Sequence, residues 1–410
     1  MKTILILSIS EKRIVNLLKA KQAGYYIIVL DTAINDKCAP YIDEYLQVDI
    51  NNKKTLLAHV DALYAKTKFT AVTTFLDKGV EPCAWVTQHL NLPGNPDSAA
   101  KATRNKYYMR QLLEKNAIPH AKFKFVESFS DLEAAANMIG YPLIFKPVGA
   151  TLSKGIFKIN SSSDLEESYN AMIELSNPNN DSNFLFYPKG YIAEEFMSGN
   201  EFSVEGVASR GEIYFAGITE KWTNSENFIE TQHVFPARID SDVNKMILNM
   251  AQQALHAINW QCGGFHIEVM LTPCGARIVE INGRLGGGYI SSHLVEIATG
   301  IDLITEHYNA VFDCEIDLAS KHNKASCISW VTATQEGCIE RWEGKDQAEQ
   351  SANVKTIMYE QDSGNMIFLP PKKFDSYRLA GVISVGENSD EAIMSAVNAK
   401  KLLHPIYAHM

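Results

Sequence analysis

Two glutamates and an asparagine lie in a stretch whose pattern predicts a β-hairpin. Residues 265–271 and 277–282 are two runs rich in apolar and β-branched side chains, and a proline and a glycine stand between them. Because side chains alternate between the two faces of a strand, Glu280 and Asn282 share one face. With a turn of roughly five residues, pairing places Glu268 directly across from Glu280. The sequence therefore predicts two carboxylates and an amide close together.

These oxygen-bearing side chains allow two interpretations. Both glutamates can face solvent on an antiparallel sheet, where alternating polar and apolar residues are ordinary. Alternatively, Glu268, Glu280 and Asn282 supply hard oxygen ligands for Mg²⁺ or Mn²⁺ held together with nucleotide phosphates. The next residues, 283–288, read GRLGGG and favour the second interpretation. Arg284 can neutralise a phosphoryl group or an oxyanion, and glycines let a ligand approach backbone N–H groups.

The length and composition of the chain limit what can surround this hairpin. Its 410 residues predict two or three structural units at roughly 150 residues per domain. The formal charge of −10 argues against a broad electrostatic hold on nucleic acid or anionic lipid. No apolar run approaches the roughly 20 residues that span a bilayer, and the scattered cysteines without a CxxC pair are typical of reduced thiols. We therefore expect a cytoplasmic protein with neither nucleic acid nor membrane as a partner.

Strand and helix patterns place the hairpin late in a chain of mixed structure. In the first hundred residues, short apolar runs alternate with amphipathic stretches, which predicts a small parallel α/β domain. A turn-rich segment at 92–97 predicts a boundary, and we expect one helix over 98–116 after it. A further helix is expected over 130–139, with Ser130 as its N-cap. Strands then predominate, and amphipathic helices are expected at 241–258 and 389–402.

A series of short motifs precedes and follows the hairpin. They are Asn105-Lys106, Phe145-Lys146-Pro147, the loop Gly149 to Gly155, Glu194 to Met197, Gly199 to Glu205, Glu268, the segment Glu280 to Arg284, and Arg378 to Gly386. In this order they resemble the ATP-grasp superfamily of carboxylate–amine ligases, and within it the L-amino acid (dipeptide) ligases. The resemblance covers most of the chain.

The resemblance implies an α/β fold, α+β in its catalytic part, which is the ATP-grasp fold with a small parallel α/β N-terminal domain. It also implies four parts of the chain. They are an N-terminal domain at 1–95, a small lid subdomain at 96–190, a large subdomain with the metal site at 191–320 and a C-terminal ligase subdomain at 321–410.

The resemblance implies ATP and Mg²⁺ or Mn²⁺ as cofactors, with metal held by Glu268, Glu280 and Asn282. The residues that it places at ATP are Lys106 and Lys146 on the phosphates, Ser153, Lys154 and Gly155 in a flap over them, Glu194, Glu195, Phe196 and Met197 at the adenine, and Glu201 at the ribose. From the residues alone, Lys106 is equally typical of a solvated helix, the flap of a hairpin turn and Glu201 of a solvated strand face. Lys146 differs, because an unpaired ammonium beside the apolar run 143–145 is costly unless it meets an anion.

Residues 229–237 resemble the family segment that approaches amino acid substrates. The resemblance assigns catalysis to Arg284, Gly287 and His233, and substrate binding to Glu230, His233, Arg284, Gly286, Gly287 and Gly288. Arg284 and the glycine N–H groups would stabilise an oxyanion, and His233 would handle an amine proton. A lone histidine is more often structural, however, and we expect His266 to be so.

The implied activity is ATP-dependent joining of a carboxylate to an amine through an acylphosphate, forming a dipeptide or amino acid amide bond with release of ADP and phosphate. Two alternatives stay open: a carboxylase or purine-pathway ligase that uses bicarbonate or formate, and a non-catalytic ATP-binding regulatory protein. The segment at 229–237 favours an amino acid substrate, and the retained carboxylate pair argues against a non-catalytic protein. The expected partners are small-molecule amino acids or other carboxylates and amines, and the resemblance allows a homodimer.

Overall fold

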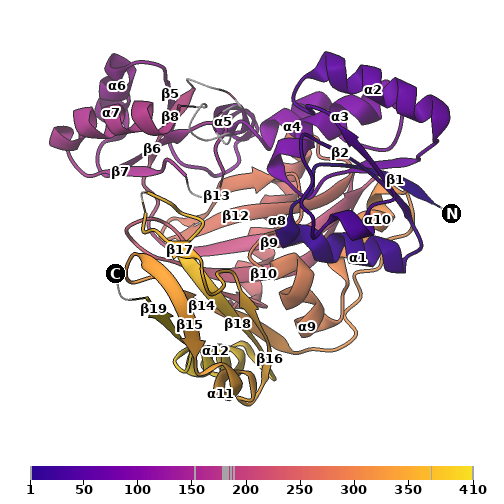
Figure 1. Ribbon diagram of the computed structural model, residues 1–410. Coiled ribbons are helices and arrows are strands. Elements are labelled where there is room, and N and C mark those ends of the chain that lie inside the picture. The colour runs from indigo at the N-terminus through magenta and orange to yellow at the C-terminus, as the bar shows by residue number, and fades with distance from the viewer. Residues whose placement is uncertain are drawn as a thin grey trace.

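The computed structural model describes residues 2–151, 154–177, 184, 187, 190–370 and 372–408 of the chain. The described strands form four sheets. Figure 1 shows the N-terminal domain and a small subdomain side by side above a large central sheet, with the C-terminal elements below.

The N-terminal domain is a parallel sheet covered on both faces. Its elements are β1 (Thr3–Leu7), α1 (Ile14–Gln22), β2 (Tyr26–Asp31), β3 (Glu44–Gln47), α2 (Lys53–Lys66), β4 (Ala71–Thr73) and α3 (Val80–Leu90), with 3₁₀ turns at Glu11–Arg13, Ala39–Tyr41 and Asp77–Gly79. The strands lie in the order β3-β2-β1-β4, and every pairing is parallel. Ile4 and Ile6 pack into one hydrophobic cluster and Leu5 and Leu7 into another, which explains why β1 is apolar throughout. The predicted parallel α/β domain is confirmed.

The helix predicted at 98–116 is wrong, because the chain forms two helices there. They are α4 (Asp97–Ala102) and α5 (Lys106–Lys115). The side chain of Asn105 accepts a hydrogen bond from the backbone N–H of Tyr108 at 3.0 Å and so begins a new helix. The break frees the backbone N–H of Lys106 to donate to the carbonyl of Val148 at 2.9 Å. It thereby fixes Lys106 beside the strand that carries Lys146.

The small subdomain is an antiparallel sheet with two helices. Its elements are β5 (Phe123–Val126), α6 (Phe129–Ile139), β6 (Leu143–Pro147), β7 (Phe157–Ile159), a 3₁₀ turn (Ser162–Asp164), α7 (Leu165–Leu175) and β8 (Tyr191–Glu195), with strand order β5-β8-β6-β7. The cap of α6 is Ser128 and not Ser130, because Ser128 and Asp131 form a reciprocal capping box. Since β8 pairs with β5 and β6, we propose that the small subdomain extends beyond residue 190 to the end of β8.

The large sheet runs through the middle of the molecule and is antiparallel. Its strands are β9 (Asn200–Ser209), β10 (Glu212–Thr223), β11 (Glu230–Phe235), β12 (Gly263–Thr272), β13 (Gly275–Asn282), β14 (Ala325–Thr332), β16 (Val354–Tyr359) and β18 (Arg378–Gly386). They lie in the order β13-β12-β9-β10-β11-β14-β18-β16. Because β14 pairs with β11, the C-terminal strands continue the sheet that carries the carboxylate hairpin.

Helices cover this sheet and connect it to the N-terminal domain. They are α8 (Ser241–Ile258), a π-helical turn (Ile290–Leu294), α9 (Val295–Thr299), α10 (Leu303–Val311) and α12 (Ser389–Lys400). The side chain of Asp240 caps α8, whose buried residues recur at helical spacing and pack with β9 and β12. The predicted helix over 241–258 is confirmed, and α12 ends two residues before the predicted 402. Residues of α1, α9 and α10 share one hydrophobic cluster. The N-terminal domain and the part of the chain that carries the large sheet therefore pack through a common core.

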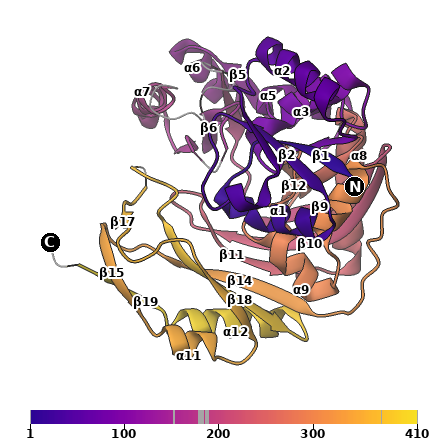
Figure 2. The same cartoon turned by 45° about the vertical axis from the view of Figure 1, so that its right-hand side comes forward.

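The last elements form a small sheet beside the end of the large one (Figure 2). They are β15 (Gly337–Glu343), α11 (Lys345–Glu349), β17 (Met366–Ile367) and β19 (His404–Tyr407), with strand order β17-β15-β19. Among the described residues, no helix is long and apolar enough to cross a membrane. All seven cysteines are free thiols.

Candidate active site

The hairpin of β12 and β13 has the predicted register. Glu268 lies opposite Glu280, and His266 lies opposite Asn282. Each glutamate has its own cation: Lys106 Nζ is 2.9 Å from Glu280 Oε1, and the side chain of Glu268 meets Lys221 and His266 instead. These ion pairs relieve the repulsion between like charges on neighbouring strands. The side chains of Glu268 and Glu280 are only 23% and 19% exposed, so the interpretation of two solvated glutamates is wrong.

Asn282 completes the oxygen set on this hairpin. The residue is 4% exposed, and its side-chain amide makes no hydrogen bond within the described part of the chain. Two carboxylates beside an amide oxygen are the ligands that Mg²⁺ and Mn²⁺ prefer, so these residues fit such an ion.

A buried lysine that the sequence reasoning missed joins Glu268 to two further carboxylates. Lys221 Nζ lies 3.0 Å from Glu201 Oε1, 2.7 Å from Glu230 Oε1 and 3.1 Å from Glu268 Oε1. Oxygens of these three glutamates lie within 4.8 Å of one another, with the ammonium among them. Burial lowers the pKa of Lys221, but Glu230, Glu268 and Glu201 together raise it well above its ordinary value. One positive charge thus holds three carboxylates, and the cluster keeps an excess of negative charge.

The small subdomain contributes an ion-pair network of its own. Lys146 Nζ lies 2.6 Å from Glu194 Oε2, and Arg110 Nε donates to Glu194 Oε1 at 2.7 Å. Lys146 therefore has the anion that its apolar strand requires. Burial would raise the pKa of Glu194, but Arg110 and Lys146 hold it at about 2. Arg110, which the sequence reasoning missed, also donates to the carbonyl of Val279 at 2.8 Å and so fastens α5 to β13.

The remaining residues expected at ATP lie around the small subdomain. Lys154 Nζ is 3.9 Å from Asp375 Oδ2 of the C-terminal part, and Gly155 has a φ of +74° that favours glycine. Ser153 lies outside the described residues. In the expected adenine segment, Glu195 pairs with Arg277 at 3.0 Å, Lys158 Nζ lies 3.9 Å from the ring centroid of Phe196, and Met197 follows the end of β8.

The expected substrate residues lie together on β11. His233 is fully buried, with its ring edge-on to Trp330 at 4.9 Å between centroids. Its Nε2 is 3.3 Å from Glu230 Oε2, but neither ring nitrogen makes a hydrogen bond of good geometry in the described structure. A Cβ at Gly288 would come within 2.6 Å of the His233 ring, so only glycine fits there. The glycine run therefore packs directly against the histidine.

Residues 283–288, the glycine loop, are held by two arginines. Arg284 Nε donates to Asp77 Oδ1 of the N-terminal domain at 3.1 Å, and Arg284 Nη1 donates to the Leu285 carbonyl at 3.2 Å. Arg13, also from the N-terminal domain, donates to the carbonyls of Gly286 and Leu285 at 3.1 and 3.3 Å. Asp77 and Arg13 were not expected from the sequence, and they show that the N-terminal domain reaches the site.

His266, expected to be structural, lies on the carboxylate hairpin itself, two residues before Glu268. Its Nδ1 is 2.9 Å from Glu205 Oε1, and its Nε2 is 3.4 Å from Glu268 Oε1. Burial lowers the pKa of His266, but Glu205 and then Glu268 raise it more, to about 9. The imidazolium therefore adds positive charge beneath Glu268 at neutral pH.

The C-terminal part closes the site around Trp330. The guanidinium of Arg378 lies 4.6 Å from the Trp330 ring centroid and 3.6 Å from Glu230 Oε2. Trp330 Nε1 donates to Glu360 Oε1 at 2.8 Å. The N-terminal domain, the small subdomain, the large sheet and the C-terminal part thus all contribute side chains to one region.

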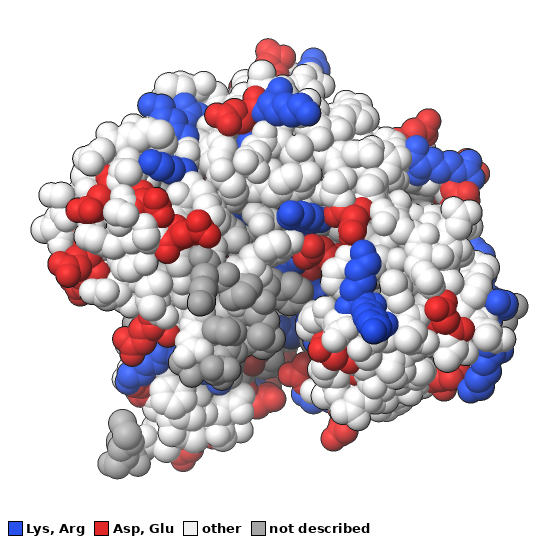
Figure 3. All heavy atoms as spheres, turned by 90° about the horizontal axis from the view of Figure 1, so that it is seen from above, with Lys and Arg blue, Asp and Glu red and all other residues white. Residues whose placement is uncertain are grey.

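Charge outside the site is mixed in sign. On the face seen in Figure 3, acidic and basic side chains are interspersed. This face offers no broad cationic surface of the kind that holds nucleic acid.

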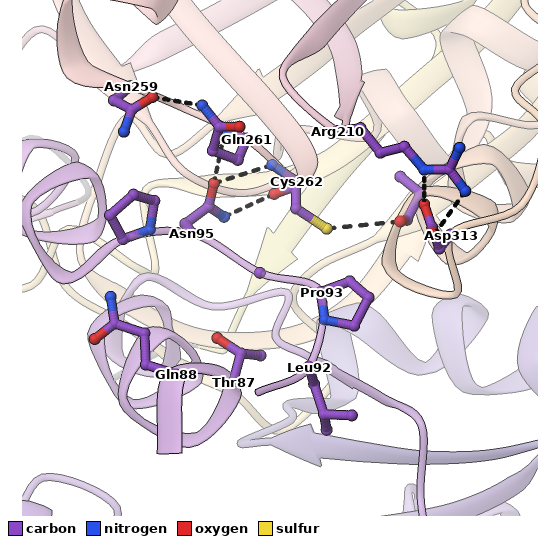
Figure 4. Close-up of a pocket in the computed structure, with 13 residues that line it drawn as sticks. Thr87, Gln88, Leu92, Pro93, Asn95, Arg210, Asn259, Gln261, Cys262 and Asp313 are labelled. Carbon is purple, nitrogen blue, oxygen red and sulfur yellow. Dashed lines mark hydrogen bonds and ion pairs between the residues drawn. The ribbon is translucent and has the colours of Figure 1, made fainter. Parts of the chain in front are cut away.

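A cavity of about 660 Å³ is lined by none of the candidate site residues described above. This Asn95 pocket is lined by Thr87, Gln88, Leu92, Pro93, Gly94, Asn95, Pro96, Arg210, Asn259, Gln261, Cys262, Ala310 and Asp313. Figure 4 shows Asn95 bonded to Gln261 and Cys262, and Arg210 paired with Asp313. None of these lining residues belongs to the charged site, by which we mean the residues described above around the β12–β13 hairpin, Lys221 and the glycine loop.

Two protein families match the chain. The ATP-grasp N-terminal domain matches residues 17–94, and the ATP-grasp domain matches residues 139–293. These ranges cover β2, β3 and β4 of the parallel sheet and much of the small and large subdomains.

Relatives and solved structures agree with these matches. Alanine–anticapsin ligase of Bacillus subtilis (strain 168) is 29% identical over 213 residues, which is 49% of this chain and 45% of that ligase. The chain thus spans about half the length of this curated relative. A formate-dependent phosphoribosylglycinamide formyltransferase of Prochlorococcus marinus (strain NATL2A) is 24% identical over 93% of this chain and 92% of its own length. The crystal structure of an L-amino acid ligase from Bacillus licheniformis superposes with a TM-score of 0.86 at 20% identity, covering 100% of this chain and 99% of that one.

Proposed function

We propose that this chain, which belongs to the ATP-grasp ligases, joins the carboxylate of an amino acid to an amine through an acylphosphate, with release of ADP and phosphate. ATP-grasp ligases use ATP with Mg²⁺ or Mn²⁺. The formation of a dipeptide or amino acid amide bond is the specific part of this proposal. It rests on the residues around His233 and on the names of the relatives.

The polyphosphate end of ATP would lie between the two subdomains. Lys106 and Lys146 present ammonium groups that are held by Glu280 and Glu194. Phosphate oxygens can replace one carboxylate contact of each lysine without leaving a buried charge unpaired. Glu268, Glu280 and Asn282 would hold the metal ion, which supplies charge neutralisation at the phosphates when bound.

Proton transfer and oxyanion stabilisation would come from the glycine loop and β11. Arg284 lies beside Asp77, which fixes its guanidinium through Nε and leaves other N–H groups for a developing oxyanion. His233 has unused ring nitrogens beside Glu230, so it can take a proton from an attacking ammonium group. Burial of His233 against Trp330 keeps water away from this proton transfer.

One observation carries the proposal most directly. The hairpin sets Glu268 and Glu280 opposite each other, and Lys106 pairs with Glu280. The side-chain amide of Asn282 lies on the same hairpin and has no hydrogen-bond partner among the described residues. A protein that only binds nucleotide has no need for this costly carboxylate pair. The geometry therefore favours catalysis over a regulatory role.

The test is phosphate release from ATP and Mg²⁺ with single amino acids and with pairs. Release that requires two amino acids, together with a new amide in the mass spectrum, supports the ligase. Release that requires bicarbonate or formate supports the alternative, a carboxylase or purine-pathway ligase. ATP binding without turnover for any amine contradicts the enzyme assignment.

A further inference from the structure

Arg13 of the N-terminal domain carries a charge that the protein does not neutralise directly. It ends the turn between β1 and α1, at the carboxyl end of the parallel sheet, where open α/β sheets bind ligands. Its guanidinium donates to two backbone carbonyls of the glycine loop, at 3.1 and 3.3 Å. Throughout the described ranges, no carboxylate forms an ion pair with it. A partly buried guanidinium usually has an anionic partner.

A second guanidinium lies beside the first. Nη2 of Arg13 and Nη1 of Arg284 both donate to the carbonyl oxygen of Leu285, at 3.3 and 3.2 Å. Two like charges are therefore held at one oxygen atom. Burial and the charge of Arg284 lower the pKa of Arg13 to about 10, against the opposing effect of Asp77 and Glu205.

The carboxylates around this pair of arginines already have partners. Asp77 is bound to Arg284 and also lies in the field of Arg104. Glu205 is held by His266 and Ser203. The other two acids, Glu268 and Glu280, are paired with the lysines and histidine described above. The surroundings therefore leave room for one more negative charge at the two arginines.

The glycine loop also leaves space beside Arg13. A Cβ at Gly286 would collide with Glu205, and one at Gly288 with His233. At Gly287, in contrast, Arg13 Nη2, at 3.7 Å, is the one atom within 4 Å of such a Cβ among the described residues beyond its chain neighbours. The face of Gly287 toward Arg13 is thus open, beside the Arg13 guanidinium and in the same loop as Arg284.

We propose that Arg13 and Arg284 form an anion site that holds a non-reacting oxyanion of the amine substrate, a carboxylate or a phosphate monoester. This inference rests on the proposed function, because it presupposes an amine substrate at the glycine loop. The planar fork of arginine suits both anions. In dipeptide formation the amine substrate is itself an amino acid, whose α-carboxylate stays free and needs such a partner. The N-terminal domain then selects the second substrate by its charge.

Binding measurements on the full chain test the anion site without requiring turnover. The protein is saturated with Mg²⁺ and ADP and titrated calorimetrically with the common L-amino acids, with their primary amides and with O-phosphoethanolamine. We expect at least one acid, or the phosphate monoester, to bind at least about 10-fold more tightly than the uncharged analogue. Arg13→Gln should remove this preference and leave the affinity for ADP unchanged.

Two further variants separate the anion site from general effects. Arg13→Lys keeps the positive charge but loses the planar guanidinium group, so it should retain a weaker preference for the charged probe over the uncharged one. This variant stays informative if Arg13→Gln fails to fold. Lys37→Gln removes another positive charge of the N-terminal domain, from a side chain that is 70% exposed, and should bind like the wild type.

The outcomes distinguish the anion site from the proposed function. A preference for the acid that Arg13→Gln abolishes supports an amino acid as amine substrate. The same behaviour with O-phosphoethanolamine alone supports the anion site but favours the purine-pathway alternative. Equal binding of charged and uncharged probes to the wild type, or a preference that survives Arg13→Gln, overturns the anion site even if the enzyme forms amides.

Discussion

The charged site and the Asn95 pocket differ in how completely their polar groups are paired. In the pocket, Asn95 Oδ1 accepts from the backbone N–H groups of Gln261 and Cys262 at 2.8 and 3.0 Å, and Nδ2 donates to the Cys262 carbonyl at 2.7 Å. In the charged site, Lys221 serves three carboxylates, while the amide of Asn282 has no hydrogen-bond partner among the described residues. The pocket has a defined cavity of about 660 Å³. Unmet polar groups, and not cavity volume, mark where ligand chemistry is expected.

The largest effect is expected from a change that removes one carboxylate charge from the hairpin. Glu280→Gln should lower kcat by at least about 1,000-fold, because the metal ligand set and the partner of Lys106 are both lost. The chain should stay folded, since the amide fills the same space, with a lower melting temperature because the buried Lys106 loses its charged partner. Steady-state phosphate release measures the effect, with the exposed Glu212→Gln as control. Undiminished turnover of Glu280→Gln would remove the metal assignment.

The next largest effect is expected on stability, at the centre of the charged site. Lys221→Met leaves Glu201, Glu230 and Glu268 without their shared cation, and should cost about 3 to 5 kcal/mol of unfolding free energy. Urea denaturation at neutral pH measures the loss. Lys245→Met, at an exposed position of α8, is the matched control and should behave like the wild type. An unchanged midpoint for Lys221→Met would show that the carboxylates do not depend on this lysine.

A pH dependence is expected from His266. Its pKa in the folded protein, about 9, lies above the ordinary value near 6.5. The stabilisation by its imidazolium is therefore fully present below about pH 6.5 and is lost as the pH rises through about 9, with a total of about 3 kcal/mol. Denaturation midpoints between pH 6 and 10 should fall for the wild type and less steeply for His266→Gln. Parallel curves would contradict the ion pair with Glu205.

The smallest effect is expected in the Asn95 pocket, where it should be structural only. Asn95→Ala removes three hydrogen bonds and should cost about 1 to 3 kcal/mol of unfolding free energy, without a change in kcat. Arg210→Gln, in an exposed ion pair, should leave both quantities as they are. A large loss of kcat in Asn95→Ala with normal stability would mean that this pocket takes part in the reaction and that the contrast between the two regions fails.

Much of the fold could be predicted from local patterns. The continuous apolar run of β1 indicates a strand buried on both faces, and the amphipathic period of α8 gives its bounds. The prediction of one helix at 98–116 failed because a single side chain, Asn105, caps a second helix. Apolar spacing alone does not show such a break.

The carboxylate hairpin was also predictable, because its register depends on a short turn within one segment. The partners of its side chains were not. Arg110 and Glu194 are 84 residues apart, Lys221 and Glu268 are 47 apart, and Arg13 and Gly286 are 273 apart. The strand order of the large sheet brings Lys221 to Glu268, and the packing of separate parts of the chain makes the other two contacts. Lys221 stands between Glu220 and Trp222 in β10, so no apolar run in the local sequence marks it as a buried lysine.

The central claim is that a substrate carboxylate receives the phosphoryl group of ATP before the amine attacks. The most direct measurement uses an amino acid with both carboxylate oxygens labelled by ¹⁸O, in a pair that supports phosphate release with Mg²⁺ and ATP. Transfer through an acylphosphate predicts that each phosphate released carries one ¹⁸O atom and that the amide keeps the other. Formation of the amide with unlabelled phosphate would contradict it.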